Sequence, residues 1–189
     1  MNMSWPALRK ARRITGRTLV LRDVTAADAA FILRLRTDER KSRYLSKTPA
    51  ALNAQIRWLN EYAQVQDQAY FIIQDYAGEP VGTVRLYDPR EDSFCWGSWI
   101  LKDGAPQTAA IESALIVYAY AIDHLGFKRA HFDVRKGNES VWRFHERFGA
   151  KRVGETDQDY LYEIDSIAID SARRRYHKFL PQSITIEWM

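Results

Sequence analysis

The sequence contains a single cysteine, Cys95, so no disulfide can form within the chain, and we expect a reducing compartment, the cytoplasm. It also lacks a long apolar stretch. The most apolar run, 109–125, carries Glu112 and Asp123 and falls short of the roughly 18 uncharged apolar residues that a membrane helix requires. Spacings of His, Cys and carboxylates that favour a metal site are missing too. We therefore expect neither a membrane span nor a bound metal.

Motifs that mark several common enzyme classes are missing as well. The chain has no Walker loop, no G-x-G-x-x-G and no G-x-S-x-G elbow. These absences argue against a nucleotide hydrolase and against a serine hydrolase.

What is present is the composition of a globular domain. The chain has 189 residues, of which 46% are hydrophobic and 28% charged, which suits one domain with a buried core. The net charge of +4 arises near the start, because six basic residues precede the first acid, Asp23, and the remainder is close to neutral. A nucleic-acid-binding protein would carry its basic residues on the folded surface, interleaved with aromatics. We therefore assign residues 1–16 to a basic N-terminal arm and expect no nucleic-acid partner.

The hydrophobic period alternates along the chain between that of strands and that of helices. It predicts strands at 19–21, 70–73, 81–87, 94–101, 130–134, near 153, at 160–164 and at 184–188, with a turn at 88–90. It predicts helices at 26–35, 52–62, 107–125, 139–148 and 166–179. The run of hairpins disfavours a doubly wound fold and predicts a single-domain α+β fold, with a mixed, mostly antiparallel sheet flanked by helices. The main domain is expected at 17–165, followed by a helix and strand extension at 166–189, whose last strand would extend a partner's sheet in a homodimer.

Two segments are candidates for chemistry. The first is the junction between the strand at 94–101 and the long helix, because a helix that starts after a strand offers unpaired N–H groups to a phosphate. Thr108 is expected to cap this helix. An ordinary strand-to-helix connection is the alternative.

The second candidate is the helix at 139–148. Asn138 is placed to cap it, and His145 lies beside its apolar face. A histidine with an ordinary pKa near 6.5 is a natural proton donor or acceptor at neutral pH. A histidine buried in a helix interface is the alternative.

At these two segments the chain resembles the GNAT superfamily of acyl-CoA-dependent N-acetyltransferases, over about residues 19–164. One branch of that family has the pattern G-x-W-[LI], nine residues, A-x-E, which here corresponds to Gly97, Trp99, Ile100, Ala110 and Glu112. A second pattern places an Asn, a Tyr seven residues on, and G-[FA] after four more residues. It corresponds here to Asn138, His145, Gly149 and Ala150, with His145 in place of the tyrosine.

The resemblance implies acetyl-CoA as co-substrate, no metal, and direct attack of a primary amine on the thioester. His145 would be the general acid that protonates the leaving thiolate, while the base stays open among Asp88, Glu91, Asp92 and a water chain. The residues that would bind acetyl-CoA are Trp99, Ile100, Leu101, Gln107, Thr108, Ala109, Ala110, Asn138 and Trp142.

The acceptor is expected to be a small anionic amine, because Arg36, Arg40 and Arg43 are suited to grip phosphates. The segments at 43–45, 55–59 and 70–73 resemble those of the amino-sugar nucleotide N-acetyltransferases of surface-polysaccharide pathways. The alternative is that these arginines lie on a solvent-exposed helix face and bind no ligand.

Two alternative functions stay open. One is an N-terminal acetyltransferase of the ribosomal-protein type, which shares the same segments. The other is a GNAT-fold binding module without catalysis, because the family's pyrophosphate loop, [QR]-x-x-G-x-[GA], corresponds here to Ala105, Thr108 and Ala110.

Overall fold

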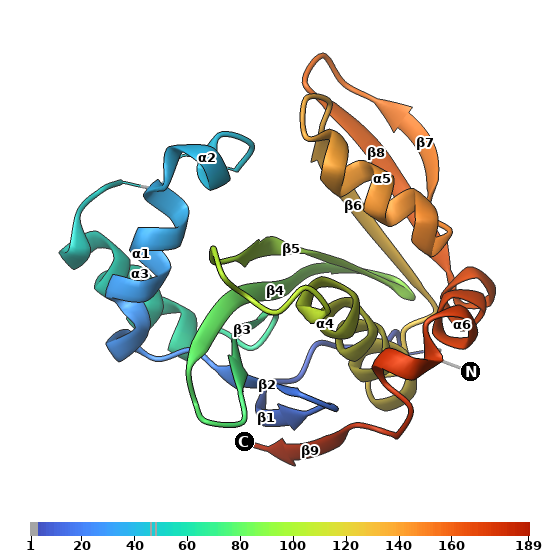
Figure 1. Ribbon diagram of the computed structural model, residues 1–189, viewed down its shortest axis with the longest axis horizontal. Helices are drawn as coiled ribbons and strands as arrows, with labels where there is room; N and C mark the ends of the chain where they lie inside the picture. Colours follow the sequence, from blue (N-terminus) through green and yellow to red (C-terminus); the bar gives the residue numbers. More distant parts are fainter. Residues whose placement is uncertain (1–3, 46, 48) are drawn as a thin grey trace.

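One sheet joins all strands of the described chain, and helices lie on both of its faces (Figure 1). The computed structural model describes residues 4–45, 47 and 49–189, so that positions 1–3 of the expected arm lie outside it. The strands are β1 (Ala11–Thr15), β2 (Leu19–Asp23), β3 (Ala69–Asp75), β4 (Pro80–Arg90), β5 (Ser93–Leu101), β6 (Arg129–Arg135), β7 (Lys151–Glu155), β8 (Asp159–Asp165) and β9 (Thr185–Trp188). The α-helices are α1 (Ala29–Thr37), α2 (Glu39–Ser42), α3 (Leu52–Gln64), α4 (Ala109–Tyr118), α5 (Glu139–Phe148) and α6 (Ser166–Arg175). Three short helical segments complete the chain: η1 (Ala26–Asp28), η2 (Ala119–His124) and η3 (His177–Phe179).

The order of strands across the sheet is β7-β8-β6-β5-β4-β3-β2-β1-β9. Within the described chain, β5 and β6 form the one parallel pair, because α4 carries the chain across between them. The other pairs are antiparallel. The expected α+β fold with a mixed, mostly antiparallel sheet is therefore confirmed.

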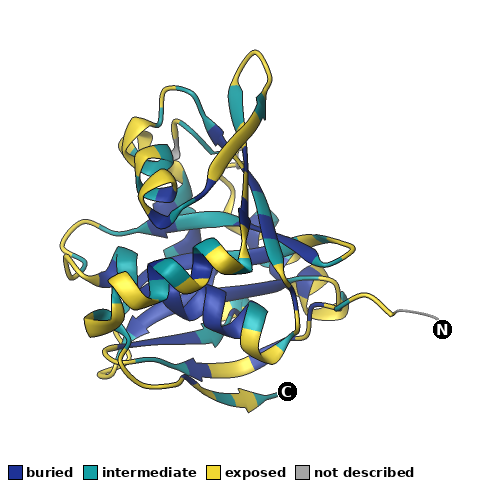
Figure 2. Ribbon diagram, turned by 90° about the vertical axis from the view of Figure 1, so that its right-hand side faces the viewer, coloured by how far each residue is buried: buried dark blue, intermediate teal, exposed yellow. Residues whose placement is uncertain are grey.

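Strand β3 is buried on both faces of the sheet. Phe71 and Ile73 belong to the large core beneath α4, α5 and α6, while Tyr70 and Ile72 belong to a smaller core beneath α1 and α3. This alternation follows from the two-residue period of a strand. In Figure 2 the buried residues concentrate in the central strands and in the helix that crosses them.

Both ends of the chain join the sheet, through β1 in the expected arm and through β9 in the expected extension. Ala11 and Ile14 are buried in the large core, so that 11–15, expected in the basic arm, forms β1 between β2 and β9. An apolar residue at every third position does not give a strand pattern, and a bulge in the β1–β9 register explains the spacing. Strand β9 pairs with β1 of its own chain and lies at the edge of the sheet, so its expected pairing with a partner's sheet stays a prediction.

Two expected boundaries differ from the structure. The hairpin between β4 and β5 turns at 91–92, and residues 88–90 belong to β4, where the register shift between Tyr87 and Arg90 accommodates Pro89. The long helix changes from α to π geometry at Ala119, and Gly126 ends the segment with a positive φ of 84°. Among the described residues no helix combines the length and the hydropathy of a bilayer crossing.

Candidate active site

Strands β5 and β6 pair at one end and diverge at the other (Figure 1). Their pairing covers Ser93 to Cys95 and stops there. Two residues farther along, a bulge in β5 lies opposite β4, and Ser98 adopts a positive φ of 46°. A bulge bends its strand away from its neighbour. Beyond Cys95, the edge of β5 that faces β6 is therefore not paired with another strand. A cleft of about 370 Å³ occupies this region.

His145 from α5 lines the cleft, together with Asn138 and Val141 at the start of the same helix. Its ring contacts Phe132 at a centroid distance of 4.1 Å and Trp96 at 5.2 Å, and its Nδ1 is buried without a hydrogen-bond partner. Burial among these rings lowers the pKa of His145 to about 3, because the charged imidazolium is poorly solvated there. The side chain is therefore neutral at pH 7, which corrects the expected value near 6.5.

Two polar side chains expected as helix caps make no capping bond. Thr108 stands at the N-cap position of α4 and Asn138 at that of α5, and neither side chain accepts a hydrogen bond from its helix. Asn138 instead lines the cleft. Within the described chain, the backbone N–H groups of Gln107 and Thr108 donate to no other backbone group. These N–H groups, which have no backbone acceptor, are suited to bind an anionic ligand at the start of α4.

The opposite wall of the cleft is formed by side chains of β4 and β6. Tyr87 and Asp133 line it, and Gly97 leaves room because a Cβ there would lie 3.0 Å from the Tyr87 hydroxyl. Burial raises the pKa of Asp133, and the nearby charge of Asp159 raises it further. Asp133 is thus a carboxylate in the cleft that is easier to protonate than an exposed one.

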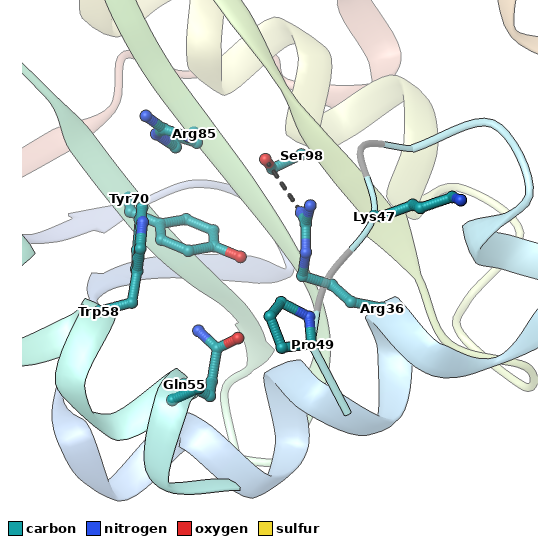
Figure 3. A pocket seen from close by; sticks show the side chains of 9 residues that line it. Arg36, Lys47, Pro49, Gln55, Trp58, Tyr70, Arg85 and Ser98 are labelled. Carbon is teal, nitrogen blue, oxygen red and sulfur yellow. Dashed lines mark hydrogen bonds between the residues drawn. The ribbon is translucent and has the colours of Figure 1, made fainter. Parts of the chain in front are cut away.

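A second pocket of about 250 Å³ adjoins the cleft (Figure 3). The two share Arg36, Arg85 and Ser98. Arg36 donates to the Ser98 Oγ at 3.3 Å, and Lys47 adds a third cationic side chain to the lining. No Asp or Glu lies among the described residues that line this pocket. The pocket is therefore positive in sign.

The structure brings only part of the expected site together. Trp99, Asn138, His145 and Arg36 line the cleft, and the Trp99 indole donates to the Ser113 Oγ at 3.1 Å. The expected residues that the described linings of the cleft and pocket do not include are Ile100, Leu101, Gln107, Thr108, Ala109, Ala110, Trp142, Arg40 and Arg43.

Several of these residues make contacts outside the cleft and the pocket. The Trp142 indole donates to the Lys136 carbonyl at 3.1 Å, and Arg40 pairs with Asp103 at 2.8 Å. Arg43 lies over the Tyr44 ring. The backbone carbonyl of Leu101 accepts a hydrogen bond from the Lys41 ammonium at 2.8 Å.

The candidate bases of the hairpin are engaged elsewhere. Asp88 pairs with Arg90 at 2.6 Å, and Asp92 pairs with Arg129 at 2.8 Å. Neither of them lines the cleft, and nor does Glu91.

Sequence reasoning named none of Tyr70, Arg85 and Asp133 as a site residue, because each lies inside a segment predicted only as a strand. For Arg85 and Asp133 a signal was available, since a charged residue inside a predicted strand points to a face that is not core.

Glu112, part of the A-x-E pattern, is structural in this fold. Its carboxylate is 1% exposed and accepts hydrogen bonds from the backbone N–H groups of Thr18 at 2.6 Å and Leu19 at 3.0 Å. It therefore ties α4 to the start of β2.

Known proteins share this architecture. The family profile described as "Acetyltransferase (GNAT) domain" matches residues 18–151. The solved structure described as "Apo FdhC- a nucleotide-linked sugar GNAT" is similar, with 37% identity, coverage of 93% of this chain and 99% of that chain, and a TM-score of 0.78. No sequence among the curated proteins matches the chain.

Two more distant structures show the fold alone. A GCN5-related N-acetyltransferase from Brucella melitensis has 20% identity, coverage of 96% of this chain and 91% of that chain, and a TM-score of 0.76. The spermidine N-acetyltransferase from Vibrio cholerae, in complex with CoA and spermine, has 17% identity, coverage of 80% and 98%, and a TM-score of 0.69.

Proposed function

The chain belongs to the GNAT family of acetyltransferases, and on that premise we propose that it acetylates the primary amine of a nucleotide-linked amino sugar. The observation that carries this proposal is the positive pocket beside the cleft. Its lining holds Arg36, Lys47 and Arg85 and, among described residues, no carboxylate. A diphosphate on the acceptor would neutralise these cations. A polyamine would meet like charge there, which disfavours an acceptor such as spermine.

The residues on the cofactor side of the cleft fit acetyl-CoA. The open edge of β5 at Trp99 to Leu101 offers backbone groups to an extended amide chain, as an added strand does. The free N–H groups of Gln107 and Thr108 suit a diphosphate, and the Asn138 carboxamide is available for hydrogen bonding. The Leu101 carbonyl keeps a second lone pair beside its bond from Lys41. When bound, acetyl-CoA supplies a thioester carbonyl that is open to attack by an uncharged amine.

Asp133 is the base in this proposal. An acceptor amine arrives as an ammonium ion at neutral pH and must lose a proton before it reacts. Asp133 faces the cleft, and its raised pKa makes its carboxylate a better proton acceptor than an exposed aspartate. The hairpin acids expected for this task lie outside the cleft. Asp159 also lines the cleft, but it pairs with Arg135 at 3.4 Å, so Asp133 is the better candidate for the base.

His145 keeps its place beside the reacting groups, but its chemistry differs from the expectation. With a pKa of about 3 it is uncharged at pH 7 and offers the N–H of a neutral imidazole. Acting as an imidazolium at neutral pH would require a negative charge beside the ring that offsets this desolvation. We propose that His145 stabilises the leaving thiolate by hydrogen bonding.

The test is release of free thiol from acetyl-CoA with a panel of amines: nucleoside-diphosphate amino sugars, the same amino sugars without the nucleotide, spermidine, and peptides with a free N-terminus. We expect turnover with the nucleotide-linked sugars at a KM at least tenfold below that of the free sugars. Preference for spermidine or for peptides would overturn the acceptor class, and turnover with none of them would favour a binding module.

Charge reversal provides the matched control for this assay. Arg36→Glu, which changes the pocket lining, should raise the acceptor KM at least tenfold and leave the acetyl-CoA KM nearly unchanged. Arg43→Glu changes an exposed arginine outside the lining and should leave both constants nearly unchanged. An equal effect of the two variants would show general charge attraction rather than a site.

A further inference from the structure

The hydroxyl of Tyr70 is an unpaired polar group in a buried position. Tyr70 is 2% exposed, and its buried hydroxyl makes no hydrogen bond of good geometry, although the side chains of Arg36 and Thr83 lie near it and partly offset the rise in its pKa that burial causes. The neighbouring Tyr62 differs, since its hydroxyl donates to Asp23 at 2.6 Å and accepts from the Tyr70 backbone N–H at 2.8 Å. Folded proteins pair nearly all their buried polar groups, so an orphan hydroxyl calls for an explanation.

This hydroxyl faces the positive pocket. Tyr70 lines it together with Gln55 and Trp58, and Figure 3 shows the phenol oxygen directed into the space beside Arg36. The register of the sheet explains the placement. Tyr70 of β3 pairs with Arg85 of β4, which pairs in turn with Gly97 of β5, so the three lie in one row across the sheet.

Arg85, in the same row, carries a positive charge that no carboxylate among the described residues neutralises. The ion pairs formed by the described residues include none for Arg85. Its Nε donates to Gln68 at 2.9 Å, and its guanidinium lies 5.2 Å from the Trp58 ring centroid and 4.6 Å from that of Tyr87. Burial lowers the pKa of Arg85, as desolvation does for a cation without a carboxylate. An anion in the pocket would compensate this partly buried charge.

The hydrogen-bond donors in the pocket indicate which kind of anion it would bind. Burial raises the pKa of Tyr70, so the phenol stays protonated and can donate a hydrogen bond. A hydroxyl donor beside guanidinium groups matches the several acceptor oxygens of a phosphate. The pocket lies on the α1–α3 face of the sheet, whereas α4, whose start suits the cofactor diphosphate, lies on the other.

We propose that Tyr70, Arg85 and Arg36 form a phosphate site for the diphosphate of the acceptor, in which the Tyr70 hydroxyl is the specificity-determining donor. This inference rests on the proposed function and adds the subsite that reads the phosphate. It assigns a ligand to the orphan hydroxyl and a counter-charge to Arg85.

The experiment titrates inorganic pyrophosphate into the full-length protein by calorimetry and compares Tyr70→Phe with the wild type. We expect the substitution to weaken pyrophosphate binding about tenfold or more, because one hydrogen bond to a charged ligand is lost. Tyr118→Phe is the matched control. Its hydroxyl is also buried without a partner, but it lies in the large core and outside the pocket, so binding should be unchanged.

Kinetics identify the source of the phosphate. Pyrophosphate should compete with the nucleotide-linked acceptor and leave the acetyl-CoA KM unchanged, and Tyr70→Phe should raise the acceptor KM with little effect on kcat. Competition with acetyl-CoA would place the anion in the cofactor site and overturn the proposal. So would wild-type protein that binds no pyrophosphate, or Tyr70→Phe that binds it equally well.

These outcomes separate the site from the proposed function. If Tyr70→Phe acetylates nucleotide-linked sugars with an unchanged acceptor KM, the phosphate site is wrong and the function stands. If pyrophosphate binds as expected and no nucleotide-linked amine is acetylated, the function is wrong and the site stands.

Discussion

The neutral protonation state of the His145 imidazole results from the aromatic rings around it. Trp96, Trp99, Phe132 and Phe144 all contact it, and none of them offers a charge that would stabilise an imidazolium. Desolvation then favours the neutral form, which explains the pKa of about 3. The same enclosure would strengthen any hydrogen bond that the ring makes to a charged group in the cleft.

His145 should make the stability of the protein depend on pH in acid. Between pH 6.5 and about 3 the unfolded chain binds a proton at His145 that the folded chain rejects, so stability falls as the pH is lowered through this window. His145→Phe removes this difference in proton binding. The free energy of unfolding of the variant should therefore fall less steeply with decreasing pH than that of the wild type, and the two slopes should differ by up to about 1.4 kcal/mol per pH unit. Urea unfolding at several pH values measures both slopes. Parallel slopes would mean that His145 titrates normally in the folded protein.

Asp133 should control the rate through its charge. Asp133→Asn cannot accept a proton, so we expect kcat/KM for the amine to fall about 10²- to 10³-fold, with a smaller dependence on pH below neutrality. The groups that influence its ionisation are Tyr87, Cys95, His131, Arg135 and Asp159. Thiol release measured across the pH range tests this expectation.

The control is Glu91→Gln, at the exposed turn of the hairpin, which should act like the wild type. If Asp133→Asn keeps its activity within twofold, Asp133 is not the base, and an equal loss in Glu91→Gln would point back to the hairpin.

At the scale of elements, α4 depends on a contact far from it in sequence. The buried carboxylate of Glu112 accepts hydrogen bonds from the start of β2, and a Cβ at Gly16 would lie 3.0 Å from its Oε1. The helix that borders the cofactor side of the cleft is thereby positioned against the N-terminal strands.

Glu112→Ala should therefore lower stability more than it lowers function. It leaves the buried N–H group of Leu19 and the partly buried N–H group of Thr18 without their acceptor, which we expect to cost about 3 kcal/mol and to lower the Tm by roughly 6–12 °C. Thermal unfolding measures the loss, and Glu61→Ala, at an exposed position of α3, is the control. A much higher acetyl-CoA KM with an unchanged Tm would show instead that Glu112 acts on the cofactor.

Elements with a regular period were predicted well from the sequence. The helix at Glu139–Phe148 has the expected bounds and ends at Gly149 in the left-handed conformation. Strand β1 was not predicted, because Arg12 and Arg13 interrupt its apolar residues and its bulge breaks the alternation. The bulge at Ser98 was not predicted either, since it depends on how β5 pairs with β4.

At the scale of the molecule, the cleft separates two chemical environments. One wall comes from α5 and β5 and contains the neutral, aromatic surroundings of His145. The other contains Asp133 of β6 and adjoins the cationic pocket of Arg36 and Arg85. An acceptor with an amine and a phosphate on one molecule would match both groups at once, which supports the proposed acceptor class.

The sequence by itself determined the order of most elements, the mixed sheet and the resemblance to the GNAT family, because hydrophobic period and short motifs depend on neighbouring residues. It also placed His145 and Asn138 at the right positions of α5. Only the tertiary structure decided the neutral state of His145, the choice of Arg36 over Arg40 and Arg43 for the pocket lining, and the contribution of Tyr70. These properties depend on burial and on the charges that β3, β4, β5 and α1 bring together from distant parts of the chain.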